Sequence, residues 1–193
     1  MIQNLSIKNF FFYPDMKALE FKPNSLEHAY LCILNDNLKE AKTIFKNLDS
    51  PRAKWGVALV SILEGYLEDY PTYFQIRNFL EIDLDFLIKN EKIDYVEQFL
   101  GSIDFLTTIN QEAYKFTARV MFENKLYSAA INYMNKSKII YYNDPELHFM
   151  LSKYYEKVHD EENALFYINE CCRILPNYYP AQILKQKIEE KLF

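Results

Sequence analysis

Apolar residues recur three and four positions apart along most of the chain, which is the spacing that places side chains on one face of an α-helix. Leu126, Ala130 and Met134 form one such stripe, and Leu147 and Leu151 begin another. The pattern predicts a chain built almost entirely of short helices. We expect helices over residues 25–35, 38–48, 51–68, 71–90 (as one helix or two), 92–104, 111–123, 126–140, 145–158, 161–174 and 178–191.

Polar capping residues mark several of the expected helix starts. Ser50 stands before Pro51, and Asp144 stands before Pro145. A proline at the first helical position lacks only a backbone N–H that would have no partner within the helix. Asn24 is expected to cap the helix that begins at residue 25, because a short polar side chain there can accept from a free backbone amide.

The helical pattern repeats along the chain. Ala130 and Ala164 are small residues in the middle of two expected helices, and they lie 34 positions apart (164 minus 130). Three further pairs keep the same register: Met134 with Ile168, Ser137 with Cys171, and Ala118 with Ser152. A period of this length is typical of proteins in which one helix pair stacks on the next.

Residues 145–178 resemble the tetratricopeptide repeat (TPR), whose helix pair carries large, small and proline residues at fixed positions. The matching positions are His148, Leu151, Ser152, Tyr155, Ala164, Ile168, Cys171 and Pro176. Residues 111–144 match with Tyr114, Ala118, Met121, Ala130, Met134 and Ser137, although Tyr142 replaces the proline and Thr117 the leucine. Val96, Leu100 and Ile103 fit the pattern within 77–110, and Ala29, Ala41 and Phe45 fit one more unit.

The resemblance implies an all-α fold, an α-α superhelix of antiparallel helix pairs that ends in a capping helix over residues 179–193. We expect residues 1–193 to form a single TPR-like domain, with residues 1–24 as an irregular N-terminal cap. Within the N-terminal part, the aromatic run 9–13 is either part of this cap or an exposed adhesive patch.

In this family the first helices of the repeats form a concave groove, so the resemblance implies a non-enzymatic module that binds a peptide or helix of another protein. The residues expected to face the groove are Phe116, Arg119, Phe122, Phe149, Met150, Lys153 and Lys157. Aromatic residues, Met and Arg are enriched at the centres of protein interfaces. Two alternatives stay open: a TPR-type chaperone that masks an apolar segment of a client, and a structural subunit that forms homo-oligomers.

Composition narrows the possible partners. The formal net charge is −5 and the isoelectric point is near 5.3, which argues against nucleic-acid binding because that usually needs a basic face. Only three glycines are present, too few for a sandwich, a barrel or a glycine-rich phosphate loop. The longest apolar runs are too short to span a bilayer. We therefore expect no membrane insertion and a cytoplasmic location.

Several residues with reactive side chains have simpler explanations. Cys171 and Cys172 are adjacent, so on a helix they point about 100° apart, which suits neither a disulfide nor a shared metal. Cys171 falls where the repeat needs a small residue, and we interpret it as structural. His28 and Cys32 are four residues apart and share a helix face, but no second pair of ligands stands nearby in sequence. We expect no metal and no cofactor.

The acidic run that contains Glu81, Asp83 and Asp85 does not indicate acid–base catalysis. Residues two apart on a helix diverge, so Asp83 and Asp85 do not share a face. We interpret these carboxylates as solvated or as lining the groove. The sequence also lacks the common hydrolase, phosphate-binding and dinucleotide-binding motifs. An enzyme is therefore not expected.

Overall fold

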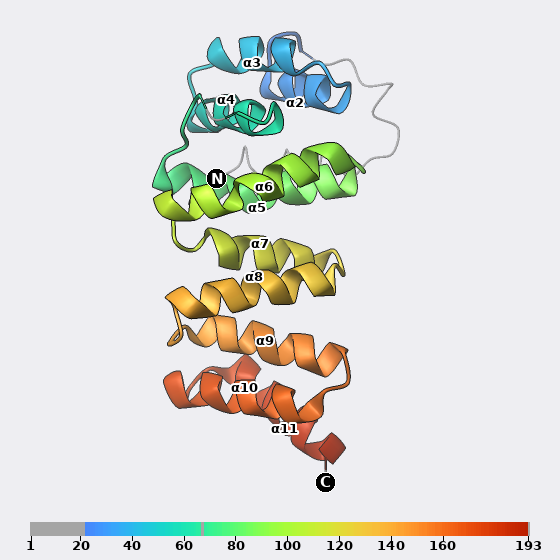
Figure 1. Cartoon of the computed structure of the whole chain (residues 1–193), viewed down its shortest axis with the longest axis vertical. Helices are drawn as coiled ribbons and strands as arrows, with labels where there is room; N and C mark the ends of the chain where they lie inside the picture. Colours follow the sequence, from blue (N-terminus) through green and yellow to red (C-terminus); the bar gives the residue numbers. More distant parts are fainter. Residues whose placement is uncertain (1–21, 67, 193) are drawn as a thin grey trace. The chain divides into compact units, whose positions relative to one another are not determined.

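The computed structural model describes residues 22–66 and 68–192, and their regular structure is entirely helical (Figure 1). This confirms the all-α prediction for the described part of the chain. The helices are α2 (Leu26–Leu34), α3 (Leu38–Lys46), α4 (Pro51–Leu63), α5 (Tyr73–Lys89), α6 (Ile93–Ile109), α7 (Ala113–Glu123), α8 (Tyr127–Ile140), α9 (Pro145–Lys157), α10 (Glu161–Ile174) and α11 (Tyr179–Leu192).

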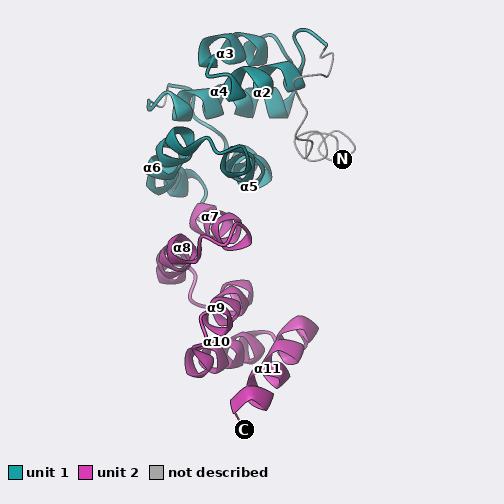
Figure 2. Ribbon diagram, turned by 90° about the vertical axis from the view of Figure 1, so that its right-hand side faces the viewer, with its two compact units in different colours: residues 1–110 teal, residues 111–193 magenta. Residues whose placement is uncertain are grey.

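The chain divides into two compact units, Met1–Asn110 and Gln111–Phe193 (Figure 2). The helices α2 to α6 belong to unit 1, and α7 to α11 belong to unit 2. The expectation that the two units act as one domain stays a prediction. Most of the expected N-terminal cap, residues 1–21 with the aromatic run 9–13, lies outside the described residues.

Unit 1 is built by packing each helix on the next along the chain. The helix α2 packs on α3, α3 packs on α4, and α4 contacts both α5 and α6. Its core contains large rings that are fully buried, among them Tyr30, Phe45, Trp55 and Phe99. The ring of Tyr30 meets the ring of Phe45 edge-on, with 5.4 Å between their centres. Burial of such large apolar surfaces is the main term that stabilises the unit.

A buried charge lies inside this aromatic core. The carboxylate of Asp83 on α5 is fully buried and accepts hydrogen bonds from Arg52, from the indole of Trp55 and from the hydroxyl of Tyr30. The guanidinium of Arg52 also lies 4.8 Å from the ring centre of Phe79. The interpretation of Asp83 as solvated or groove-lining is therefore wrong, because α5 turns this residue toward α2 and α4. Asp85 is consistent with the interpretation as a solvated carboxylate, because it forms an exposed ion pair with Lys89.

Unit 2 contains consecutive helix pairs. The helix α7 packs on α8, α9 packs on α10, and α8 and α10 contact the helix that follows each of them. In addition, α9 contacts both α7 and α11, so these three helices lie on one side of the unit, with α8 and α10 on the other (Figure 2). The last pair and α11 share a buried cluster that includes Ala164, Ile168, Cys171, Ala181 and Ile188.

The turns inside the helix pairs share one backbone geometry. Glu91, Lys125 and His159 each follow the end of a helix with φ values of 56°, 62° and 59°, in the left-handed region. At each turn the amides of the left-handed residue and of the residue after it donate to carbonyls of the last helical turn, as Lys125 N–H to Phe122 O and Leu126 N–H to Met121 O. This is the Schellman ending. The three turn residues stand 34 positions apart (125 minus 91, and 159 minus 125).

The predicted helix bounds agree closely with the structure, with three informative differences. The helix α4 ends at Leu63 rather than at residue 68, because Gly65 adopts a φ of 82° and its amide bonds back to Ile62. The helix α6 continues to Ile109 instead of ending at 104. The cap of α2 is Ser25, whose side chain accepts from the amide of His28, whereas Asn24 lies outside the helix.

Candidate interaction site

The helix pairs of unit 2 are α7–α8 and α9–α10. The first helix of each pair, α7 or α9, carries the seven residues that the sequence analysis places in a groove. The start of α9 is fixed by Asp144, whose carboxylate accepts from the amides of Glu146 and Leu147 at 2.9 and 3.4 Å. Pro145 occupies the first helical position, as expected from the sequence. Because α9 contacts α7, a fixed start for α9 sets which side chains of the two helices meet.

Three of the seven residues come together at one point. The ammonium of Lys153 on α9 lies 5.3 Å from the ring centre of Phe122 on α7 and 5.7 Å from that of Phe149 on α9. Both rings are half-buried, and Lys153 is exposed. Phe149 also meets the ring of Tyr178 edge-on at 5.3 Å. We call Phe122, Phe149 and Lys153 the aromatic–lysine cluster.

The other four residues divide into buried and surface positions. Phe116 is 4% exposed and Met150 is 9% exposed, so these side chains pack within the unit and add little to its surface. Lys157 at the end of α9 is exposed. Arg119 is half-buried, and its guanidinium lies 5.3 Å from the ring centre of Phe116. Of the seven residues predicted to face the groove, Phe116 and Met150 therefore contribute little to the surface that a partner could contact.

Arg119 belongs to an ion-pair network that the sequence analysis missed. It pairs with Glu146, and the neighbouring Lys115 pairs with Glu112, Asp144 and Glu146 at 2.9, 2.7 and 3.2 Å. The network joins α7 to the start of α9. Spacing along one helix reveals only the pair of Lys115 with Glu112, because the other two carboxylates lie about one repeat further along the chain.

The network keeps Lys115 charged although the side chain is buried. Burial by itself lowers the pKa of Lys115, but the hydrogen bonds to Asp144 and Glu112 and the negative charge of Asp144 and Glu146 outweigh it and raise the pKa above its ordinary value. The network therefore fixes α7 against the start of α9. It holds the two helices that carry the aromatic–lysine cluster.

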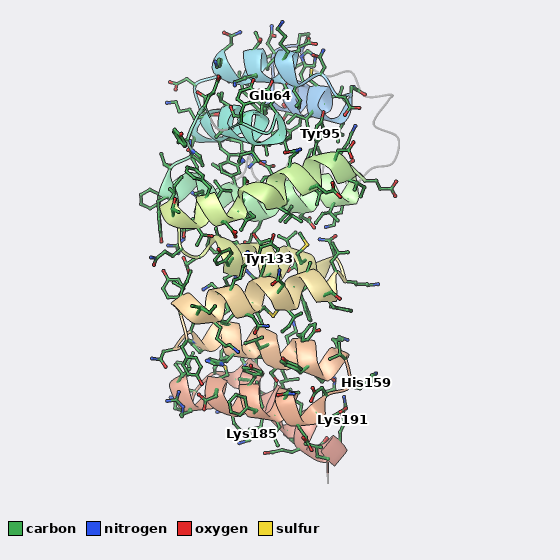
Figure 3. All side chains as sticks on the ribbon, viewed as in Figure 1. Glu64, Tyr95, Tyr133, His159, Lys185 and Lys191 are labelled. Atoms are coloured by element: carbon green, nitrogen blue, oxygen red, sulfur yellow. The ribbon has the colours of Figure 1, made fainter. Side chains whose placement is uncertain are left out.

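A second set of ion pairs joins α9 to α11. The carboxylate of Glu156 accepts from Lys187 and Lys191 at 2.9 and 2.7 Å. Lys191 lies near the end of α11, as its label in Figure 3 shows. The hydrogen bonds from Lys191 and Lys187 lower the pKa of Glu156 to about 2. These pairs fix the helix that follows the last helix pair.

Two cysteines and two histidines of unit 2 lie in positions that favour a structural role. Cys171 is fully buried, and burial raises the pKa of its thiol to about 11, the opposite of what a nucleophilic thiolate requires. Cys172 is half-buried. His148 is also fully buried, with one ring nitrogen bonded to the carbonyl of Tyr142 and its ring stacked on Tyr167 at 5.9 Å. His159 lies in the turn between α9 and α10 (Figure 3).

Among residues 22–66 and 68–192, no helix combines the length and the apolar character needed to cross a bilayer. A comparison with protein families and with curated proteins finds no family model that matches the sequence and no significantly similar protein.

Proposed function

We propose that this protein is a TPR-like helical-repeat module that binds a segment of another protein, without enzymatic activity of its own. The interpretation of the chain as a helical-repeat protein is supported by local structure that recurs at intervals of 34 residues. Left-handed turn residues recur at Glu91, Lys125 and His159. Ala130 and Ala164, equivalent in register, are both fully buried. Stacked helix pairs of this kind form an α-α superhelix, which is the architecture that we propose for the chain.

The observation that carries the proposed binding site is the position of Lys153 over both Phe122 and Phe149. Two half-buried rings offer flat apolar area to an incoming side chain. The exposed ammonium beside them offers an ionic partner to a carboxylate. Aromatic side chains are enriched among the residues that contribute most of the binding energy at interfaces. The site therefore favours a peptide or helix that carries an apolar residue near an acidic one.

Arg119 and Lys115 have a supporting role in this proposal. Because they pair with Glu146 and Asp144, they hold α7 against the start of α9 and so fix the distance between Phe122 and Phe149. Lys153 and Lys157 are then the exposed cations among the residues predicted to face the groove. A binding segment with acidic residues would contact these two lysines first, and its association would weaken as salt is raised.

The experiment is affinity capture from native lysate with the wild-type chain and with the double variant Phe122→Ala/Phe149→Ala, followed by mass spectrometry. The matched control is Ile139→Ala/Phe166→Ala, which removes two exposed apolar side chains from α8 and α10, 87% and 52% exposed. We expect one partner to be recovered by the wild type and by the control but lost by the Phe122/Phe149 variant.

Lys153→Glu supplies a third variant that reverses the charge without changing the rings. It should weaken capture of the same partner, and the loss should be larger at low salt. Equal recovery by the wild type and by the Phe122/Phe149 variant would contradict the proposed site. Loss by the Ile139/Phe166 control alone would move the interface to α8 and α10. A cytoplasmic location and the absence of nucleic-acid binding stay predictions.

A further inference from the structure

Three side chains with different metal-binding atoms meet in unit 1, far along the chain from the proposed interaction site. His28 and Cys32 lie on α2, and Glu40 lies on α3. One ligand atom of each residue lies within 4.8 Å of the other two. The sequence shows only the first two residues as a pair. Glu40 joins them because the turn between α2 and α3 folds the second helix back onto the first.

We propose that His28, Cys32 and Glu40 bind a zinc ion through an imidazole nitrogen, the thiolate sulfur and a carboxylate oxygen. The mixture of one sulfur, one nitrogen and one oxygen ligand suits Zn²⁺, which takes all three in tetrahedral sites. Three protein ligands leave the fourth position for water. The proposal stands apart from the interaction site in unit 2 and does not depend on it.

The distances are close to those of a filled site. With zinc bonds of about 2.0–2.3 Å, neighbouring ligand atoms of a tetrahedral site lie about 3.3–3.8 Å apart. The upper limit of 4.8 Å in this structure exceeds these separations by about 1.0–1.5 Å. Rotation of side chains alone can close this gap, because Glu40 is exposed and His28 is half-buried. The same exposure gives an ion a path to Cys32, which is 6% exposed.

The backbone around the three residues is well fixed. Ser25 Oγ accepts from the amide of His28 at 3.2 Å, and Asn37 Oδ1 accepts from the amide of Glu40 at 3.3 Å. The Asn37 side chain also donates to the carboxylate of Glu40 at 2.5 Å, which orients a prospective ligand as outer-shell groups do in known metal sites. Asp36, with a φ of 61°, closes the turn between the helices.

Binding of an ion would replace two hydrogen bonds, one made by Cys32 and one made by His28. Burial raises the pKa of the Cys32 thiol, as do the charge of Glu40 and a hydrogen bond to it. Zinc binding breaks the S–H bond, forms a Zn–S bond and releases the proton to solvent. His28 Nδ1 accepts a long hydrogen bond of 3.3 Å from the amide of Asn24, and this exposed bond is given up when either ring nitrogen binds the metal.

The test is titration of the full chain, freed of metal by a chelator, with Co²⁺ and then with Zn²⁺. We expect one Co²⁺ per chain, visible bands of a tetrahedral ion and a near-ultraviolet band from thiolate to cobalt, all removed when Zn²⁺ is added. The zinc affinity should rise about tenfold per pH unit between about pH 7 and 8, because binding releases the thiol proton. Zinc should also raise the Tm of the protein.

Variants locate the ligands. Cys32→Ser should abolish the near-ultraviolet band, and Glu40→Gln should weaken zinc binding by at least about tenfold. The matched control is Cys172→Ser, which removes a half-buried thiol from α10 and should leave the titration unchanged. Glu40→Gln is at an exposed position and should fold like the wild type even if Cys32→Ser does not.

Three results would overturn the proposal. The first is a wild-type chain that shows no thiolate band with stoichiometric Co²⁺ and binds Zn²⁺ only at millimolar concentration. The second is a titration in which Glu40→Gln and Cys32→Ser, both folded, bind the metals as tightly as the wild type. A band that disappears in Cys172→Ser instead would place any metal on α10, which also contradicts the proposal.

Discussion

The hydroxyl of Ser152 on α9 donates a 2.8 Å hydrogen bond to the backbone carbonyl of Ala164 on α10, and neither residue is exposed. A side chain as short as serine reaches a backbone oxygen of the facing helix only where the two helices approach closely. Both residues stand at positions where the proposed TPR-like register expects a small side chain. The close approach explains why both positions hold small residues, since a larger residue at either position would separate the helices.

Cys171 provides a test of this packing. It is fully buried beside Ala164 and Ile168, with Ala181 of α11 in the same cluster. We expect Cys171→Leu to overpack this cluster and to lower the free energy of unfolding by about 1–3 kcal/mol. Cys171→Ala should be milder, and Cys172→Leu, at a half-buried position at the edge of the same cluster, should cost less than Cys171→Leu. Urea unfolding measures all three, and a wild-type midpoint for Cys171→Leu would contradict the packing.

Ser137 occupies the position in the preceding helix pair that corresponds to Cys171. Its environment predicts a substitution that does not destabilise the protein, in contrast to Cys171→Leu. Its hydroxyl is buried without a hydrogen-bond partner among the described residues. Replacement by alanine removes an unsatisfied polar group, so Ser137→Ala should be neutral or should stabilise the protein by about 1 kcal/mol.

The natural comparison for Ser137→Ala is Ser152→Ala, since the Ser152 hydroxyl is paired. That substitution should destabilise by about 1 kcal/mol. Thermal unfolding of the two variants should therefore shift Tm in opposite directions, or leave Ser137→Ala unchanged. A larger loss for Ser137→Ala than for Ser152→Ala would refute this reading of the two hydroxyls.

Local signals in the sequence predicted the helices well, because caps and periodicity act within one or two turns. Ser50 and Asp144 cap the helices that they were expected to cap. One of the two largest errors in a helix end, at α4, came from Gly65: a left-handed residue ends a helix, but a glycine in sequence does not reveal that it adopts this conformation.

Contacts between separate helices were beyond local reasoning. Arg52 and Asp83 are 31 positions apart in sequence, and nothing in either segment alone shows that they pair. The residues predicted to face the groove illustrate the same limit, because the sequence analysis places both Phe116 and Phe122 in the groove, whereas their burial distinguishes them. Phe116 is 4% exposed and lies under Arg119, while Phe122 stays half-buried beside Lys153.

The buried pair of Arg52 and Asp83 should be the most sensitive electrostatic interaction of unit 1. Asp83→Asn keeps the shape of the side chain but leaves the guanidinium of Arg52 buried without a counter-charge. We expect a loss of about 3–5 kcal/mol in the free energy of unfolding, measured by urea denaturation. Asp85→Asn, which breaks the exposed pair with Lys89, should cost only about 0.3–0.5 kcal/mol. Equal effects of the two substitutions would show that the buried pair contributes nothing beyond a surface pair.

The ion pairs of Glu156 should make the stability of unit 2 depend on pH. Its pKa is lowered from an ordinary value of 4.5 to about 2 by Lys191 and Lys187, so the folded state favours the ionised form. The stabilisation is present above about pH 4.5 and is lost as the pH falls toward 2. After allowance for the exposure of the two lysines, it should amount to about 1–2 kcal/mol at pH 7.

The check is chemical unfolding of wild type and Glu156→Gln between pH 2 and pH 7. The difference in stability between the two proteins should be largest at neutral pH and should disappear at the acidic end. The neighbouring pair of Lys185 and Glu189 lies within α11, so Glu189→Gln is a control that keeps the contact of α11 with α9. A difference that stays constant over the whole range would rule out the ion pairs as its cause.

The central claim is that the face formed by α7 and α9 binds a protein segment through Phe122, Phe149 and Lys153. Hydrogen–deuterium exchange of the chain, alone and with the partner recovered by affinity capture, tests it most directly. We predict slower exchange in residues 113–123 and 145–157 on binding, with little change in residues 127–140 and 161–174, and no slowing in the Phe122→Ala/Phe149→Ala variant. Protection confined to α8 and α10, or protection that persists in that variant, would contradict the claim.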